Sequence, residues 1–274
     1  MQYTPQQMQG YQGFNPKCRI GNWSEDVALQ EAKMEQYFRA KNSGNLISEK
    51  ISRKMNVHLQ KCKLSSGDVI QFGDIVMLQN KDTLGYLSFD LDDDVSEHSH
   101  KKKYGATTGH SDVNAVNRNC YVIHRVKSQD LFVIPKEEEN YLHYGQPFTL
   151  RTVDDLGDET LFLTSEAKST TTFSPVSCQN EVYFSNKYTY ASQFIVDHLT
   201  KRMRLEYEGD PVNPRCGVVI RHMQTNQFLS SETKFIKNND FGKEYEVCGK
   251  TNLDMHKKEK STNVWSFVNT SPKN

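Results

Sequence analysis

Apolar and polar positions recur along residues 66–270 with a long period. Glycines at positions 73, 145 and 217 lie 72 residues apart, and each stands just ahead of an apolar or β-branched run. These runs occupy residues 74–78, 146–150 and 218–222. Short runs of this composition, bounded by turn residues, predict β-strands. We therefore expect a strand to begin at the same phase in each of three copies.

Two further landmarks follow the same period. Each copy continues with a polar loop, at 80–83, 154–159 and 224–226, and then a second strand marked by Leu87-Ser88, Leu163-Thr164 and Leu229-Ser230. The last strand of each copy carries an aromatic residue, and these are Tyr121, Phe194 and Trp265. Large rings dominate the energetics of protein cores, so we expect these three side chains to pack in or beside one common core.

Third strands are predicted in the second and third copies, at 180–184 and 244–248, whereas the first copy has a polar stretch there and is expected to be degenerate. Three units of this size cannot each bury an apolar face alone, so they must share a core. Closure into a barrel removes the exposed sheet edges. The sequence therefore predicts a mainly β fold, a β-trefoil of three four-strand repeats over residues 66–270.

The residues before this domain predict an arm and two helices. Residues 1–23 begin with a stretch rich in Gln, Asn, Gly, Pro and Tyr, which is typical of an extended arm. Ser24 is a good N-cap for a helix that stops at residues 42–44, and a second helix is expected over 46–63. We expect a helical hairpin over 24–65 that packs on itself and on the β domain, with a partner groove as the alternative.

Composition and charge narrow the function. The chain has 36% hydrophobic and 25% charged residues, no run long enough to span a membrane and no secretory signal at its start, so we expect a cytosolic or cytoskeletal protein without a membrane partner. Residues 1–65 hold 10 Lys and Arg against 5 Asp and Glu, which leaves 24 against 29 in residues 66–274. This asymmetry suggests that the N-terminal segment meets an acidic surface. The whole chain is not basic, so nucleic-acid binding is not favoured.

The spacing of the candidate residues does not match known metal-binding or nucleotide-binding sites. His98, His100 and His110 lie near the aspartates at 92–94, but this arrangement matches no defined ligand set, and we expect a solvated loop. Residues 105–109 resemble a phosphate-binding loop, yet no Lys-Ser or Lys-Thr follows them. The six cysteines, at 18, 62, 120, 178, 216 and 248, are scattered singly and are expected to be reduced thiols.

Catalytic arrangements are not recognisable either. Glu206, Glu208 and Asp210 could be paired catalytic carboxylates, but a strand or turn leading into the third copy is the better interpretation. No spacing of Ser, Cys, His and carboxylate residues assembles a nucleophile with its base. We therefore expect no enzyme activity, no catalytic residue, no cofactor and no metal ion.

Several short stretches carry a resemblance to a known family. They are Arg19-Ile-Gly-Asn-Trp23, His143-Tyr-Gly145, Leu205-Glu-Tyr-Glu-Gly209, Phe241-Gly-Lys-Glu244, Glu246-Val247 and Asn263-Val-Trp265. From about residue 19 to 268 the chain resembles the cilia- and flagella-associated protein 161 family. The resemblance implies an MIR-like β-trefoil and a structural role as a microtubule inner protein. Such a protein binds α/β-tubulin and other inner proteins in the lumen of the A-tubule of ciliary doublets, near its seam, and stabilises the axoneme for motility.

Three residues in the arm are the candidate contacts. We expect Arg19, Asn22 and Trp23, together with the exposed hairpin loops, to touch tubulin or its neighbours, although Trp23 could instead pack on the first helix. Two other functions stay open. One is a carbohydrate-binding trefoil, although only Trp265 occupies the aromatic position and the Gln of a Gln-x-Trp motif is missing. The other is a regulatory module of a larger signalling assembly.

Overall fold

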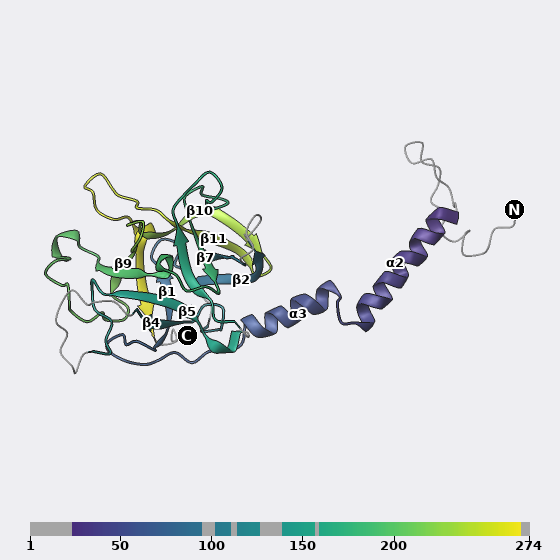
Figure 1. The fold of residues 1–274 in the computed structure, drawn as a ribbon, viewed down its shortest axis with the longest axis horizontal. Helices are drawn as coiled ribbons and strands as arrows, with labels where there is room; N and C mark the ends of the chain where they lie inside the picture. The colour runs from purple at the N-terminus through teal and green to yellow at the C-terminus, as the bar shows by residue number, and fades with distance from the viewer. Residues whose placement is uncertain (1–23, 95–101, 111–113, 127–138, 157–158, 270–274) are drawn as a thin grey trace. The chain divides into compact units, whose positions relative to one another are not determined.

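The computed structural model describes residues 24–94, 102–110, 114–126, 139–156 and 159–269 (Figure 1). The chain divides into two compact units, residues 1–56 and 57–274, and each is considered by itself. The second unit contains all the strands, so the predicted mainly β architecture is confirmed. No helix among the described residues has the length and apolar character needed to cross a bilayer.

Two helices occupy the N-terminal part. Helix α2 (Ser24–Asn42) ends where the sequence predicts, and Gly44 beyond it adopts a left-handed φ of 66° that favours glycine. Helix α3 (Ile47–His58) is shorter than the predicted 46–63. The predicted end is wrong because the chain after His58 pairs with other backbone: Lys61 forms a bridge with Val116, and the Cys62 N–H donates to the Ala115 carbonyl at 3.0 Å.

Twelve strands follow among the described residues. They are β1 (Ile75–Asn80), β2 (Leu87–Asp94), β3 (Tyr104–Thr108), β4 (Tyr121–Arg125), β5 (Pro147–Thr152), β6 (Phe162–Glu166), β7 (Asn180–Ser185), β8 (Phe194–His198), β9 (Gly217–His222), β10 (Leu229–Asn239), β11 (Gly242–Gly249) and β12 (Val264–Val268). Short 3-10 helices join some of them, namely η1 (Asp154–Leu156), η2 (Tyr190–Ser192), η3 (Lys201–Met203) and η4 (Ser261–Asn263).

Six strands close into a ring. β1 pairs with β4, β4 with β5, β5 with β8, β8 with β9, β9 with β12, and β12 returns to β1, all antiparallel. The other six strands form three hairpins, β2–β3, β6–β7 and β10–β11. Their inner strands β3, β7 and β11 pair with one another, which joins the hairpins to a common centre. Figure 1 labels β1, β4, β5 and β9 of the ring and β2, β7, β10 and β11 of the hairpins.

The three predicted core aromatics occupy equivalent positions. Each pairs with the second residue of the first strand of its own copy: Val76 with Tyr121, Phe148 with Phe194, and Val218 with Trp265. All three rings are buried, as are the predicted leucines at 87, 163 and 229. The predicted common core is confirmed at these positions.

The glycine landmark is correct in two copies and wrong in the third. Gly73 and Gly145 have φ values of 93° and 81°, and their N–H groups donate to the carbonyls of Ile123 and Val196 at 2.8 and 3.0 Å. In the third copy Arg215 takes this place, with a φ of 63° and an N–H donated to the Phe267 carbonyl at 2.7 Å. Gly217 is instead the first residue of β9. It lies two residues after Arg215, the position that is structurally equivalent to Gly73 and Gly145.

The first copy is not degenerate. Residues 104–108 form β3, a fully buried strand that pairs with β2, β7 and β11. Its polar threonines are tolerated because they are hydrogen-bonded: Thr107 donates to Glu244 at 2.7 Å, and Thr108 lies 2.8 Å from the Ser231 hydroxyl. The prediction of a polar stretch without a strand was therefore wrong.

Candidate functional site

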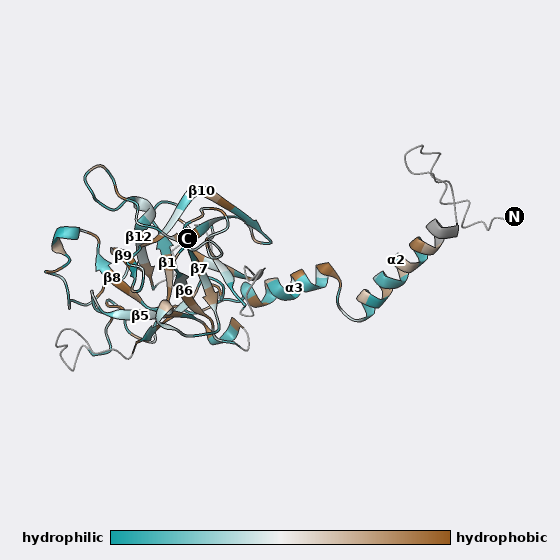
Figure 2. Ribbon diagram, turned by 45° about the horizontal axis from the view of Figure 1, so that its top comes forward, coloured by the Kyte–Doolittle hydropathy of each residue, from teal (hydrophilic) through white to brown (hydrophobic). Residues whose placement is uncertain are grey.

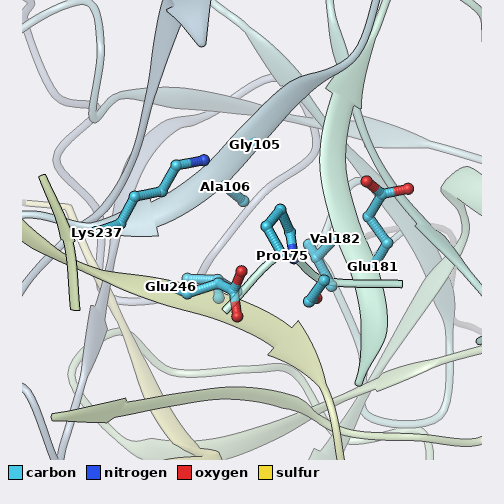
Figure 3. Close-up of a pocket in the computed structure, with 9 residues that line it drawn as sticks. Gly105, Ala106, Pro175, Glu181, Val182, Lys237 and Glu246 are labelled. Atoms are coloured by element: carbon cyan, nitrogen blue, oxygen red, sulfur yellow. The ribbon is translucent and has the colours of Figure 1, made fainter. Parts of the chain in front are cut away.

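The centre where β3, β7 and β11 meet has no room for a substrate. A cavity of ≈ 10 Å³ lies there, lined among others by Ala106, Pro175, Glu181, Lys237 and Glu246 (Figure 3). This volume holds about one water molecule, whereas small-molecule sites are typically several hundred Å³. The Glu246 carboxylate is already occupied, because it accepts the N–H groups of Val176 and Ser177 at 3.0 and 2.7 Å. The cavity is therefore not a substrate pocket.

Among the described residues, Glu244 is the most buried carboxylate of an ion pair. Its Oε1 lies 2.8 Å from Arg118 Nη1, and its Oε2 accepts from Thr107 and Asn239 at 2.7 and 2.6 Å. Burial alone favours the neutral acid, but Arg118 and these donors outweigh it and hold the pKa of Glu244 below its ordinary value. The Arg118 guanidinium also lies 3.7 Å from the centre of the Phe241 ring. The pair ties β11 to the segment before β4, and the Thr107 hydrogen bond ties β11 to β3.

A second ion-pair network joins the β2–β3 hairpin to the β6–β7 hairpin. Lys103 Nζ lies 2.9 Å from Glu166 and 3.1 Å from Glu181, and the Tyr183 hydroxyl donates to Glu166 at 2.6 Å. Burial lowers the pKa of Lys103, but the two carboxylates more than offset this effect, so the pKa lies above its usual value. Burial raises the pKa of Glu181. Each group is committed to a partner within the fold, which indicates a structural role.

The predicted chemical motifs occupy structural positions. Residues 105–108 lie within β3, so they do not form a phosphate loop. Glu206, Glu208 and Asp210 lie in the turns between β8 and β9, as the sequence interpretation favours. His98 and His100 lie outside the described residues, and within the described part no group of three His, Cys, Asp or Glu side chains could hold a metal ion.

The cysteines with shifted acidity are poorly suited to nucleophilic chemistry. Five cysteines lie in the described ranges and all are free thiols. Burial raises the pKa of Cys62, Cys120 and Cys248, which disfavours the reactive thiolate. These three thiols act as small apolar groups in the fold.

The carbohydrate-binding alternative is not favoured. Trp265, the one aromatic that matched a lectin position, is fully buried, and its Nε1 donates to the Leu229 carbonyl at 2.9 Å. Tyr121 and Phe194 are equally buried. None of the three rings is free to stack on a sugar.

Two sets of exposed apolar side chains are the candidate interaction surfaces. Helices α2 and α3 expose Met34, Phe38 and Ile47 by 59%, 51% and 77%, and Figure 2 shows brown apolar residues along both helices. These side chains pack little within their own unit, so they are candidates for contact with a partner. The strand unit exposes Leu84, Leu205 and Met255 on three loops. The sequence predicted the loop at 80–83 and the hairpin loops as contacts. It did not predict the exposure of Leu205 and Met255, although the Lys-rich run 256–260 marks the loop of Met255.

The predicted contact residues Arg19, Asn22 and Trp23 lie outside the described residues. They directly precede α2 in the sequence, so their proposed role is linked to that helix. Their assignment as contacts stays a prediction.

The sequence comparison decides the family. The family model described as "Cilia- and flagella-associated protein 161-like domain" matches residues 45–270. The chain belongs to the cilia- and flagella-associated protein 161 family. Members of that name from Danio rerio and Bos taurus are 31% and 29% identical to it; both alignments span 95% of this chain and cover 89% and 83% of the relatives. Membership in the cilia- and flagella-associated protein 161 family confirms the resemblance and supports a ciliary or flagellar association.

Solved structures support the fold of the strand unit. The SDF2-like protein from Arabidopsis thaliana superposes with a TM-score of 0.53 at 17% identity, over 73% of this chain and 94% of that chain. The S. cerevisiae protein O-mannosyltransferase Pmt1-Pmt2 complex gives a TM-score of 0.51 at 16% identity, over 77% of this chain and 26% of that chain. At these identities the likeness concerns architecture alone.

Proposed function

We propose that this chain is a structural microtubule inner protein of motile cilia. In this proposal it binds α/β-tubulin and neighbouring inner proteins in the lumen of the A-tubule, near its seam, and stabilises the axoneme. The observation that carries the proposal is the family match over residues 45–270. The protein turns over no substrate and uses no cofactor.

The architecture of the strand unit supports a role for this unit as a rigid spacer. We propose that the six-strand ring and the three joined hairpins form a β-trefoil of the MIR type, because three equivalent strand pairs place one buried aromatic each in the same register. Buried ion pairs tie the hairpins together at their centre. A body of this kind transmits load between the partners on its outside without a conformational step.

The net charge of the chain supports binding inside the microtubule lumen rather than on the outer microtubule surface. Proteins that grip the outer microtubule surface meet acidic tails and tend to be strongly basic, whereas this chain has a formal net charge of zero. A luminal protein meets folded surfaces and can rely on shape and on several weak contacts. Arg19, Asn22 and Trp23 and the exposed faces of α2 and α3 are the proposed contacts.

The proposal is tested by extraction of axonemes. A tagged chain replaces the endogenous protein in motile ciliated cells, and isolated axonemes are washed with increasing salt. We expect the chain to stay with the doublets at salt that strips outer-surface proteins. A chain with Arg19, Asn22 and Trp23 all changed to Ala should be released earlier. Release of the unaltered chain at low salt contradicts the luminal assignment.

A further inference from the structure

A loop between β11 and β12 is ordered by its own hydrogen bonds. Leu253 and Glu259 form a bridge, and the Asp254 carboxylate accepts the N–H groups of His256 and Lys258 at 2.8 and 2.9 Å. The hydrogen bonds from the Lys258 and His256 backbone lower the pKa of Asp254. Lys257 adopts a left-handed φ of 57° at the tip. The loop, drawn in yellow at the edge of the strand unit in Figure 1, is thus held in one shape.

Two side-chain contacts tie this loop to its neighbours. Arg204, in the segment after β8, places Nη2 2.7 Å from Glu259 Oε1. The Ser261 hydroxyl donates to the Asp82 carboxylate, in the turn between β1 and β2, at 2.8 Å. Residues 80–86, 200–205 and 252–261 therefore form one continuous feature, the three-loop surface.

Each loop of this surface presents an apolar side chain to solvent. Met255 is 98% exposed, Leu205 84% and Leu84 57%. A single exposed apolar residue is common on a protein surface, but these three lie on segments that contact one another. An ordered loop that presents a flexible methionine is suited to fill a recess on another protein.

The same surface is basic on an otherwise acidic unit. Its three segments hold seven Lys and Arg against three Asp and Glu, whereas residues 66–274 as a whole hold 24 against 29. Of the three acids, Glu259 is buried against Arg204 and Asp254 is bonded to loop backbone. Lys257, Lys258 and Lys260 are exposed, and none pairs with a carboxylate within the described ranges. The charge that faces outward is therefore positive.

We propose that the three-loop surface docks onto an acidic patch of folded α/β-tubulin, with Met255 inserted into an apolar recess and the lysines around it. The identity of the partner rests on the proposed function. Charge complementarity selects an acidic partner and accelerates encounter. Because the loop is already ordered by its own hydrogen bonds, little conformational entropy is lost on docking.

The test uses purified α/β-tubulin polymerised in the presence of the chain, so that luminal sites are accessible, followed by sedimentation over a range of concentrations. The variant Lys257→Glu/Lys258→Glu/Lys260→Glu should bind about tenfold or more weakly, and the affinity of the unaltered chain should fall with added salt. Met255→Ser should weaken binding severalfold with little change in salt dependence.

A matched control makes the same charge change elsewhere. Lys168, Lys187 and Lys243 are exposed on other loops and strands, and their triple change to Glu should leave binding within about twofold, since remote exposed charges are largely screened. Unfolding temperatures of all variants are measured to show that the changed side chains, all exposed, leave the fold intact. Equal loss in the control and the loop variant, or no loss in either, overturns the three-loop surface while tubulin binding stands. Absence of binding by the unaltered chain overturns the tubulin contact in the proposed function and this inference with it.

Discussion

At the scale of single residues, the core aromatics show why the repeat could be recognised. Tyr121, Phe194 and Trp265 pair with equivalent residues and are all buried. Two of them also donate a hydrogen bond to the carbonyl that begins the second strand of their copy, Tyr121 to Leu87 at 3.1 Å and Trp265 to Leu229 at 2.9 Å. The positions of large aromatic residues can be read from a sequence. The hydrogen bonds that the Tyr hydroxyl and the Trp N–H make can be known only from the fold.

Tyr121→Phe tests the value of one such bond. The change removes only a hydroxyl, but it leaves the buried carbonyls of Leu87 and Arg118 without that donor, so we expect a loss of about 1–3 kcal/mol in the free energy of unfolding. Chemical denaturation measures it. Tyr190→Phe makes the same change on an exposed ring and should cost less than about 0.5 kcal/mol. Equal costs at the two sites contradict the argument.

Gly73→Ala isolates backbone strain. A Cβ at Gly73 would meet nothing within 4 Å, so any cost comes from the φ of 93°, which L-residues rarely adopt. We expect a loss of about 1–2 kcal/mol in the free energy of unfolding. Gly73→Asn should lose less, because Asn tolerates positive φ better than Ala. A neutral Gly73→Ala result contradicts the assigned conformation.

At the scale of elements, the pattern of apolar residues predicted those strands whose buried residues are themselves apolar. β7 and β11 have apolar or β-branched residues in their sequence and were expected, whereas β3 reads Tyr-Gly-Ala-Thr-Thr and was not. Its burial depends on partners far away in sequence, such as Glu244 and Ser231. The end of α3 was wrong for a related reason, since pairing with residues 115–117 overrides local helical propensity. The three-loop surface escaped prediction because its loops meet only in the fold.

Glu244→Gln tests the tie between β11 and the segment before β4. Removing one partner of a buried pair leaves Arg118 uncompensated, and we expect a loss of about 3 kcal/mol in the free energy of unfolding at pH 7. The folded-state pKa of Glu244 is below the unfolded value, so the ionised group stabilises the fold above the unfolded pKa and this contribution disappears as pH falls through the folded pKa.

The gap in stability between the unaltered chain and Glu244→Gln should therefore shrink on acidification below the ordinary range of a glutamate. Denaturant unfolding at a series of pH values measures it. Glu35→Gln breaks an exposed pair with Arg39 and should cost less than about 1 kcal/mol at any pH. A pH-independent gap contradicts an ionised Glu244.

At the scale of the whole molecule, the chain has a strand unit and a helical unit. The strand unit includes His58, which is fully buried, and residues 61–62, which pair with other backbone. The described helices of the first unit expose apolar side chains such as Met34 and Ile47. The sequence indicated the family, whereas the predicted division between residues 65 and 66 and the contact residues Arg19, Asn22 and Trp23 stay predictions.

Deletion of residues 1–56 tests this division. Because the second compact unit begins at residue 57 and its first buried side chain is His58, we expect residues 57–274 to unfold cooperatively within about 2 °C of the full chain. Scanning calorimetry measures the transition. The same deletion should weaken retention in axonemes. A transition lowered by ten degrees or more contradicts the independence of the strand unit.

The most direct test of the central claim is cryo-electron microscopy of ciliary doublets isolated with and without this protein. The account predicts a density inside the A-tubule, near the seam, that fits the strand unit and is lost when the gene product is absent. It also predicts that the density contacts tubulin. Unchanged luminal density in doublets that lack the protein, or a difference confined to the outer surface, contradicts the account.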